Sequence, residues 1–323
     1  MTTLVNGKSL RLAFGETISD LGAQNDRIVV LDGDTGSSTY TSLFESAHPE
    51  RFFQMGITEQ NMLGMAAGMA TVGLIPIVST FSCFIVSRAH DSIRVLIAQP
   101  NANVKMMGGY AGLLAGMTGK THLMFDDISI MRAMANMTVV APVDEIETRS
   151  ALKAIIEYEG PVYLRLSRPD TAIVFDDDYE FVLGKAVTVR EGTDVTVFST
   201  GTQTARALEA AETLAPEGID VHLAHIPTVK PLDVDAVVAA AKKTGLVVTS
   251  EEHTVVGGLG GAIAEALAVS APTPMTLHGI QDVFGESGPD GPLLDKYGIS
   301  SEKTADAIRG AVKNYKSSSL QQS

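Results

Sequence analysis

Short apolar runs alternate with helical patterns along the first half of the chain. The runs predict strands at 28–31, 75–79, 103–107, 138–141 and 162–166. Apolar residues at helical spacing predict helices between them, at 59–71, 86–98, 128–135 and 145–157. This alternation is typical of βαβ units, whose strands form a mostly parallel sheet.

A second, shorter series of the same kind follows. It predicts strands at 195–199, 221–224, 246–249 and 275–278, and helices at 204–214, 234–243, 260–269 and 301–312. Between the two series, the segment 168–181 lacks periodicity and contains three consecutive aspartates, which marks a domain boundary. We therefore predict an α/β fold with two domains, each a mostly parallel sheet flanked by helices. The expected bounds are 1–175 and 181–315, followed by a disordered polar tail at 316–323.

Composition narrows the possible classes of function. The chain has 323 residues, of which 45% are hydrophobic, enough for two α/β domains with sizeable cores. A net charge of −14 argues against nucleic-acid binding, because phosphate backbones require a basic face. No apolar run reaches membrane-spanning length, and residues 1–10 lack the layout of a signal peptide. The single Cys83 cannot form an internal disulfide, so we expect a cytoplasmic protein in which this thiol is buried and inert.

One acidic residue and two aromatic residues give the clearest candidate chemistry. Glu59 opens a helix rich in small residues, and Phe81 and Phe84 follow in the next strand-to-helix run. Taken alone, Glu59 could simply complement the helix dipole, with Thr58 as a cap, and the phenylalanines could be ordinary core. Taken together, they suit a flat heteroaromatic cofactor, because the rings can stack on it while the acid holds a ring nitrogen.

Three other segments carry candidate chemistry. His122 follows a glycine-rich segment at 108–116, where it is either a satisfied loop histidine or a ligand-binding residue. The run 32–36 imitates part of a magnesium diphosphate signature, but Thr35 replaces the required glycine, so we predict no metal site in this chain. The glycine-rich run 256–261 lacks the spacing of a dinucleotide-binding motif and indicates close backbone packing instead.

The order of these motifs resembles the transketolase family, which depends on thiamine diphosphate. Residues 9–171 resemble the pyrimidine-binding domain of that family, and 181–315 resemble its C-terminal domain. The diphosphate-binding domain that precedes them in a full-length transketolase has no counterpart in this sequence. The resemblance therefore implies the small subunit of a split transketolase, paired with a diphosphate-binding subunit in an α2β2 heterotetramer. The expected reaction transfers a two-carbon ketol unit from a ketose to an aldose through thiamine diphosphate, with Mg²⁺ or a similar divalent ion held by the partner.

Carried over position by position, the resemblance implies two catalytic residues. Glu59 would contact a ring nitrogen of the aminopyrimidine of the cofactor and favour its imino tautomer. His122 would hydrogen-bond the carbonyl and hydroxyl end of the donor sugar. Phe81 and Phe84 would stack on the pyrimidine, and Asp34 would lie near the cofactor.

At the distal end of the site, three residues match positions that grip a sugar phosphate: Arg11, Ser38 and Arg168. Tyr110 stands where the family usually has a phosphate-binding histidine, and Thr118 where it has an aspartate that reads sugar hydroxyls. Leu123 replaces an expected glutamine. We therefore expect a sugar phosphate or another anionic sugar as substrate, with a specificity that differs from that for the ordinary pentose phosphates.

Two other functions remain open at this stage. The β subunit of a 2-oxo acid dehydrogenase E1 component shares the two-domain layout, but the three residues of the expected anion site argue against it. A non-catalytic assembly subunit would also lack the diphosphate-binding domain. The joint presence of the four cofactor and donor residues argues against that alternative: Glu59, Phe81, Phe84 and His122.

Overall fold

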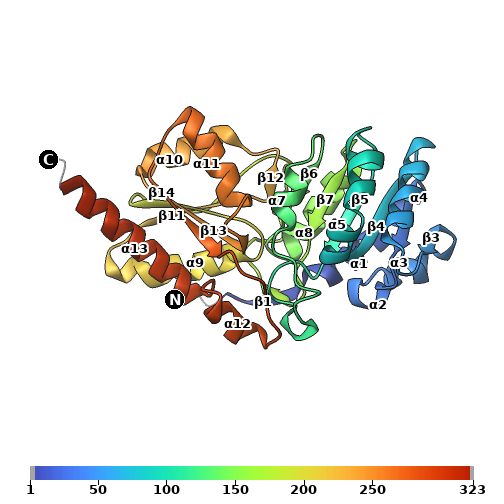
Figure 1. Cartoon of the computed structure of the whole chain (residues 1–323), viewed down its shortest axis with the longest axis horizontal. Helices are drawn as coiled ribbons and strands as arrows, with labels where there is room; N and C mark the ends of the chain where they lie inside the picture. The colour runs from blue at the N-terminus through green and yellow to red at the C-terminus, as the bar shows by residue number, and fades with distance from the viewer. Residues whose placement is uncertain (1–3, 321–323) are drawn as a thin grey trace.

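Two mostly parallel sheets, each covered by helices on both faces, lie side by side along the long axis of the molecule (Figure 1). This arrangement comes from a computed structural model that describes residues 4–320. It confirms the predicted α/β fold of two domains, each built on a mostly parallel sheet flanked by helices.

The first sheet has the strand order β12-β6-β7-β5-β4-β2-β3. Its strands are β2 (Ile28–Asp32), β3 (Phe52–Gln54), β4 (Ile75–Phe81), β5 (Lys105–Gly109), β6 (Thr138–Val140), β7 (Val162–Arg165) and β12 (Thr228–Lys230). Only the pair of β12 with β6 is antiparallel. Every residue of β2 and β7 is buried, because helices cover both faces of the sheet, and this explains the largely apolar runs in the sequence.

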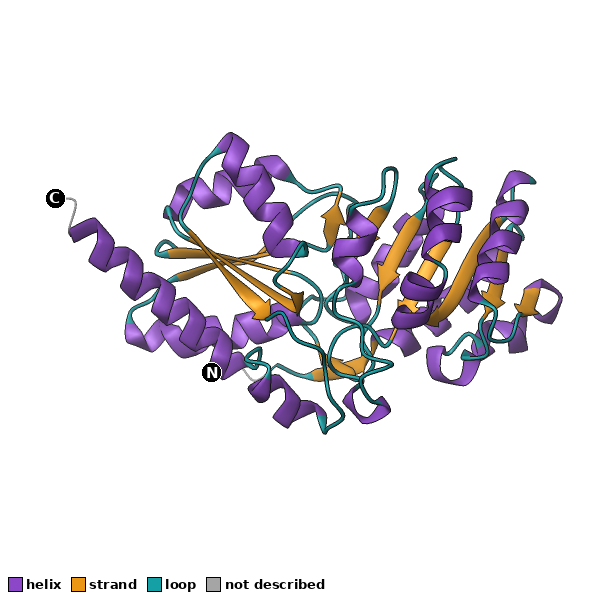
Figure 2. Cartoon of the chain, in the orientation of Figure 1, coloured by secondary structure: helices purple, strands orange, loops and turns teal. Residues whose placement is uncertain are grey.

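Helices of the first domain form two layers around this sheet (Figure 2). One layer contains α1 (Leu10–Gln24), α3 (Ser42–Ala47) and α8 (Glu145–Glu157). The other contains α4 (Glu59–Thr71), α5 (Ser82–Arg88), the π-helical turn η2 (Ile93–Ala98) and α7 (Asp127–Arg132). The short helices α2 (Gly36–Thr39) and α6 (His90–Ser92) and the turn η1 (Pro49–Arg51) join these pieces, and β1 (Asn6–Ser9) pairs antiparallel with β8 (Asp170–Ala172).

The second domain has a five-stranded sheet in the order β14-β13-β10-β11-β9. Its strands are β9 (Val187–Arg190), β10 (Val195–Ser199), β11 (Val221–His225), β13 (Val247–Thr254) and β14 (Met275–Ile280). Helices α9 (Gln203–Leu214) and α13 (Ser301–Leu320) pack on one face, and α10 (Val234–Thr244) and α11 (Leu259–Ser270) pack on the other. The turn η4 (Ala215–Glu217) follows α9, and α12 (Asp290–Lys296) precedes α13.

The predicted helices agree with the structure where one face is clearly apolar. Helices α4 and α8 have the predicted bounds. The predicted helix at 86–98 is wrong as a single element, because α5 starts directly after β4 and the backbone leaves the helical region at Ala89 (φ −107°, ψ 15°). Helix α1 was not predicted. It is buried on several sides, and close packing of Gly15 against Tyr40 replaces the apolar stripe that would have marked it.

The predicted disordered tail needs correction over residues 316–320, where α13 continues to Leu320. Packing of the earlier turns of α13 against α9 propagates the helix. The Ser317 and Ser318 hydroxyls donate to carbonyl oxygens one turn back, each at 2.9 Å, and so do not compete with the helical backbone bonds. Residues 321–323 of the predicted tail lie outside the described residues.

The two domains are interlocked. Strand β12 belongs to the second series of elements in the sequence, but it forms the edge of the first sheet. An apolar cluster between the domains joins Tyr110, Leu113 and Leu123 of the first series with Ile280 and Leu293 of the second. The bounds 1–175 and 181–315 remain a prediction, because the contacts cross between the two parts of the chain.

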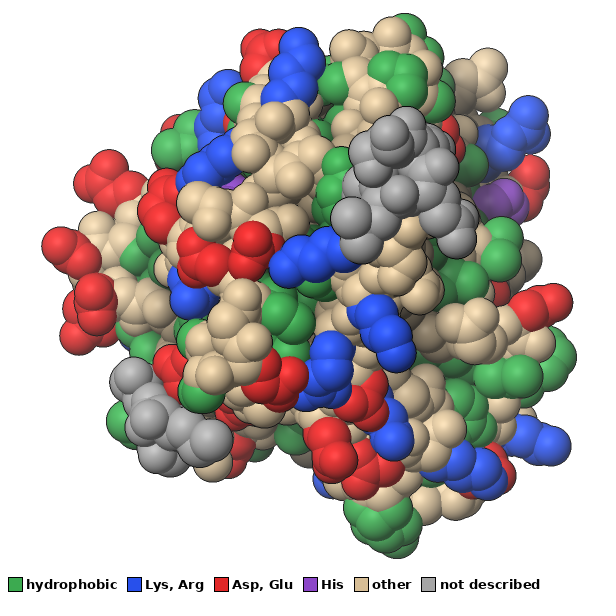
Figure 3. Space-filling view, turned by 90° about the vertical axis from the view of Figure 1, so that its left-hand side faces the viewer, with side chains coloured by type: hydrophobic (Ala, Val, Ile, Leu, Met, Phe, Trp, Pro, Cys, Tyr) green, Lys and Arg blue, Asp and Glu red, His purple; other side chains and the backbone are tan. Residues whose placement is uncertain are grey.

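The surface of the second domain carries acidic and basic side chains intermixed at the end of the molecule (Figure 3). Helix α13 contributes such a pair, in which Arg309 lies 2.7 Å from Glu217. Over residues 4–320, no helix combines the length and apolar character needed to cross a membrane.

Acid should destabilise the protein through His278 in β14. Burial lowers the pKa of His278 from 6.5 to about 4. Between these two values, His278 binds a proton in the unfolded chain but stays neutral in the folded chain. Stability should fall as the pH drops from about 6.5 through 4. When the pH is lowered from 7 to 4.5, the free energy of unfolding should fall in both proteins, but by about 2 kcal/mol less in His278→Gln than in the wild type. Urea unfolding at the two pH values measures this difference, and an equal loss in both proteins would contradict the assignment.

Candidate active site

The carboxyl edge of the first sheet collects residues that the sequence singled out. Phe81 ends β4, Asp34 follows β2 and Tyr110 follows β5. Asp34 and Tyr110 both have positive φ angles, 64° and 58°, which are uncommon outside glycine and turn the chain sharply away from its strand. Open parallel sheets bind ligands at this edge, so the location agrees with the predicted site.

Four aromatic side chains meet here in a row that we call the ring row: Tyr110, Phe81, Phe84 and His122. The Tyr110 and Phe81 rings stack with centroids 4.0 Å apart, and Phe81 and Phe84 stack at 5.6 Å. His122 meets Phe84 edge-on at 5.2 Å and Phe81 at 6.2 Å. The structure therefore brings together side chains from three separate segments of the sequence.

Glu59 joins the ring row through Arg88, which the sequence analysis missed. The Arg88 Nη1 donates to Glu59 Oε1 at 2.9 Å, and its guanidinium carbon lies 4.1 Å from the Phe84 ring centroid. The Glu59 side chain is 4% exposed and that of Arg88 is 48% exposed, so a buried carboxylate is paired with a half-exposed cation. The position of Arg88, one helical turn after Phe84, was the available signal.

Cys83 lies between the two phenylalanines of the ring row and is buried. Burial raises the pKa of the Cys83 thiol to about 12, which keeps it protonated and unreactive at neutral pH. This environment agrees with the expected inert thiol.

The distal end of the site is organised by Arg11, which is largely buried. Its Nε and Nη2 donate to the Arg168 carbonyl at 3.1 and 2.7 Å, and its Nη1 donates to the Ser38 carbonyl. The guanidinium carbons of Arg11 and Arg168 lie 4.8 and 5.7 Å from the Tyr110 ring centroid. Arg11 therefore braces the segments that carry Ser38 and Arg168, and its contact with a substrate oxyanion remains a prediction.

Tyr110 is electrostatically unusual. Burial raises the pKa of its hydroxyl, but hydrogen bonding to Ser38 and the positive charges of Arg11 and Arg168 outweigh burial and place the pKa below its ordinary value. A more acidic phenol is a stronger hydrogen-bond donor to an anion. The contact of Tyr110 with a substrate oxyanion remains a prediction.

Two other predicted residues are exposed to solvent. The Asp34 backbone amide donates to Gln54 Oε1 at 3.0 Å, and its carboxylate faces outward. Thr118 lies in the turn η3 (Gly116–Thr118), where its hydroxyl donates to the Ala115 carbonyl. Their roles toward the cofactor and the sugar remain predictions.

The run 32–36 has a structural role, because its first residue, Asp32, accepts hydrogen bonds from neighbouring residues. Asp32 is fully buried, and its carboxylate accepts from the Thr35 amide at 2.8 Å and from the Thr41 hydroxyl at 2.7 Å. Within the part of the chain that the structure describes, no group of three or more His, Cys, Asp or Glu residues is placed to hold a metal ion.

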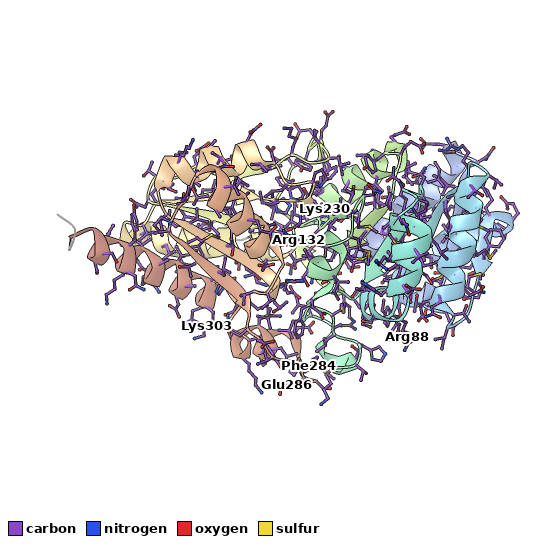
Figure 4. All side chains as sticks on the ribbon, turned by 45° about the horizontal axis from the view of Figure 1, so that its top comes forward. Arg88, Arg132, Lys230, Phe284, Glu286 and Lys303 are labelled. Atoms are coloured by element: carbon purple, nitrogen blue, oxygen red, sulfur yellow. The ribbon has the colours of Figure 1, made fainter. Side chains whose placement is uncertain are left out.

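A cleft of about 710 Å³ opens beside Phe84 and Arg88, between the two domains. Its far wall includes Phe284, which is 92% exposed, and Figure 4 shows Arg88 and Phe284 on opposite domains along one edge of the molecule. Near Phe81, the buried hydroxyls of Thr80 and Ser82 have no hydrogen-bond partner among the described residues. Both oxygen atoms are enclosed by protein atoms, and neither residue lines the cleft.

Two family models match the chain. The model described as "Transketolase, pyrimidine binding domain" matches residues 6–173, and "Transketolase, C-terminal domain" matches residues 184–304. The chain belongs to the transketolase family. The family implies thiamine diphosphate as the cofactor, and the buried acid and stacked rings of the site fit its pyrimidine.

Relatives extend over nearly the whole chain. It is 43% identical over 309 residues to the "Putative transketolase C-terminal section" of Methanocaldococcus jannaschii, covering 95% of this chain and 97% of the relative. It is 40% identical over 298 residues to the "6-deoxy-6-sulfo-D-fructose transketolase subunit SqwH" of a Clostridium species, covering 92% of each. A solved structure titled "Split gene transketolase, inactive beta4 tetramer" matches with a TM-score of 0.88 and 44% identity, covering 95% of this chain and 99% of that one.

These matches confirm the predicted family and the resemblance to split transketolases. The chain has the two domains of the small subunit of a split transketolase, a transferase.

Glu59 and Arg88 should be energetically coupled. Glu59→Gln removes the buried charge and Arg88→Ala removes its partner, so the double variant should lose less stability than the sum of the two single losses. We expect a coupling energy on the order of 1 kcal/mol, because water reaches the half-exposed Arg88. Urea unfolding of the four proteins measures the coupling, with a substitution of the exposed Arg94 in η2, Arg94→Ala, as the control. Strict additivity for Glu59 and Arg88 would show that the ion pair contributes nothing.

Proposed function

We propose that this chain is the small subunit of an α2β2 split transketolase, which transfers a two-carbon ketol unit from a ketose to an aldose through thiamine diphosphate. The observation that carries the proposal is the link from Glu59, through Arg88, to Phe84 of the ring row, which itself contacts Phe81 and His122. A buried acid beside stacked rings is what the pyrimidine of the cofactor requires.

Thiamine diphosphate, when bound, supplies a carbon nucleophile that carries the two-carbon unit between sugars. The residues of this chain would hold the reacting groups around it. Phe81 and Phe84 would hold the pyrimidine ring by stacking, and Glu59 would share a proton with a ring nitrogen. Arg88 would balance the charge of Glu59 while the ring is absent. His122, at the edge of the ring row, would donate a hydrogen bond to the oxygen atoms of the donor sugar.

The partner subunit would hold the diphosphate and its Mg²⁺ or similar divalent ion. This chain offers little for them, because the Asp32 carboxylate already accepts from Thr35 and Thr41. The outer face of α4, next to Glu59, provides a surface for assembly. Ile57 is exposed just before Glu59, and Val72 is exposed after the other end of the helix. The turn η2, which packs against α4, adds the exposed Val95 and Leu96. The tetrameric, inactive state named for the solved β-chain relative also supports activity that depends on a partner.

The substrate would be a sugar phosphate or another anionic sugar. Tyr110, Ser38 and Arg168 surround one end of the site with hydrogen-bond donors and positive charge. A relative named for 6-deoxy-6-sulfo-D-fructose supports an anion other than phosphate as one possibility. A 2-oxo acid dehydrogenase would have less use for this end of the site, and the transketolase relatives favour sugar transfer over it. A cytoplasmic location is part of the proposal, because a lone buried thiol suits a reducing compartment.

The chain alone should have no transketolase activity, and the diphosphate-binding subunit should restore it in the presence of thiamine diphosphate and Mg²⁺. In the reconstituted complex, Glu59→Gln should reduce turnover by on the order of 10² or more, because an amide cannot take part in the proton transfer. A coupled assay with each subunit alone and with both subunits together measures this. Activity of the isolated chain, or near-normal turnover by the Glu59→Gln complex, would overturn the proposal.

The standard pentose phosphates should be poor substrates. Thr118 in place of an aspartate removes a charged acceptor for sugar hydroxyls, and Tyr110 in place of a histidine changes the anion end. A mismatch of this kind discriminates by roughly 10²-fold. Initial rates with xylulose 5-phosphate and ribose 5-phosphate, compared with a panel containing 6-deoxy-6-sulfo-D-fructose, test this. The variant Thr118→Asp/Tyr110→His should improve the pentose phosphate rates; ordinary efficiency of the wild type with that pair would show both replacements to be neutral.

A further inference from the structure

The loop 110–123 contains much of the expected substrate machinery, and its conformation depends on the second domain. The loop runs between β5 and α7, and it carries Tyr110, Thr118 and His122. Its base is closed by the Gly112 amide, which donates to the Met124 carbonyl at 2.6 Å. The rest of the loop has little regular structure of its own, so contacts from outside must fix its shape.

Glu252, near the end of β13, supplies the central contact. Its Oε1 accepts from the backbone amides of Leu113 and Leu114 at 2.7 and 3.2 Å. Its Oε2 accepts from the Thr202 hydroxyl at 3.1 Å and from both terminal nitrogens of Arg206 at 3.0 Å. Glu252 is only 2% exposed. One oxygen of the Glu252 carboxylate thus accepts hydrogen bonds from its own domain, and the other accepts from the loop of the first domain.

Two loop positions, 112 and 116, require glycine because they lie in close contact with the second domain. Gly112 has a φ of +90°, and a Cβ there would lie 2.2 Å from Glu252 Oε1. A Cβ at Gly116 would lie 2.2 Å from Leu293 and 2.5 Å from the Gly288 carbonyl oxygen. The loop is therefore pressed against the second domain at two points, with no space for a side chain at either.

A second connection reaches the start of α7, just after the loop. The backbone carbonyl of Glu252 accepts from Arg165 Nη2 at 2.9 Å. Arg165 Nε in turn donates to Asp127 Oδ2 at 2.8 Å, and all three residues are buried. Glu252 is therefore connected to both ends of the segment that presents His122.

We propose that Glu252 is a positioning residue through which the C-terminal domain holds the loop 110–123 in the shape that presents His122 to the donor sugar. This rests on the proposed transketolase function. It gives the C-terminal domain a part in sugar binding without direct contact with substrate or cofactor.

Glu251 provides a matched control. It is the preceding residue of β13, it is equally buried, and its carboxylate also accepts two backbone amides, Leu259 at 2.7 Å and Gly260 at 2.8 Å. Both of those amides belong to helix α11 of the same domain. Glu251→Gln therefore perturbs the same strand without releasing the loop.

Hydrogen–deuterium exchange of the isolated chain tests the loop contact without any need for activity. Glu252→Ala and Gly112→Ala should speed exchange of peptides within 111–122 by about tenfold or more, because charge-assisted bonds to two amides are lost. Glu252→Gln keeps one acceptor oxygen and should have a smaller effect, and Glu251→Gln should leave these peptides unchanged. Equal exchange in Glu252→Ala, Gly112→Ala and wild type would overturn the proposal.

Kinetics of the reconstituted complex test the consequence for the sugar. With the ketose that the wild type prefers, Glu252→Ala and Gly112→Ala should raise KM and lower kcat/KM by on the order of tenfold. The apparent affinity for thiamine diphosphate should change much less, since Glu59 and Phe81 lie on other elements. A merely structural defect would lower kcat and the apparent affinity for thiamine diphosphate together, with Glu251→Gln as the comparison, and that result would also overturn the proposal. If the wild-type complex is inactive with every sugar, the proposed function fails, while the exchange experiment still decides whether Glu252 orders the loop.

Discussion

A buried carboxylate needs hydrogen-bond donors, and this requirement determines how the edge of the first sheet, the loop 110–123 and the second domain lie against one another. Glu59 meets Arg88, Asp127 meets Arg165 and Tyr163, and Glu252 meets Arg206 together with two loop amides. Leaving any of these acids buried without partners would cost several kcal/mol. Each acid therefore determines where at least one neighbouring segment can lie. The two sheets set the overall architecture, and the charged contacts determine the positions of the loops that follow the strands.

The candidate site has two ends with different chemical character. At one end, the buried acid and the stacked rings form an environment for a flat heteroaromatic group. At the other end, Tyr110 and the arginines near it form an environment for an anion. The ring row connects the two ends, because Phe81 stacks on Phe84 on one side and on Tyr110 on the other. A cofactor and a sugar bound at these places would therefore be adjacent.

Much of the fold could be read from periodicity. The strands at 28–31 and 195–199 are buried throughout and mostly apolar, because parallel strands are covered on both faces. Helices α4 and α8 appear with the expected bounds. Periodicity failed where burial is not one-sided. Helix α1 buries Arg11 and two glycines together with its apolar residues, so no stripe marks it. The tail of α13 is polar, and its helical state depends on the packing of the earlier turns, from Ala305 to Val312.

The βαβ architecture and the residue types of the candidate site could be predicted from the sequence, because the spacing of apolar residues reflects which faces are buried, and because Glu59 and the two phenylalanines stand in a characteristic order. The sequence could also indicate the family, from the order of Glu59, Phe81 and Phe84. Three contacts follow from the folded structure alone: Arg88 pairs with Glu59, Arg11 donates to backbone carbonyls, and Glu252 accepts from two loop amides that lie 138 and 139 residues away in the sequence. Those partners are distant in sequence, and a donor that satisfies a buried acid is selected by its place in space and not by its place in the chain.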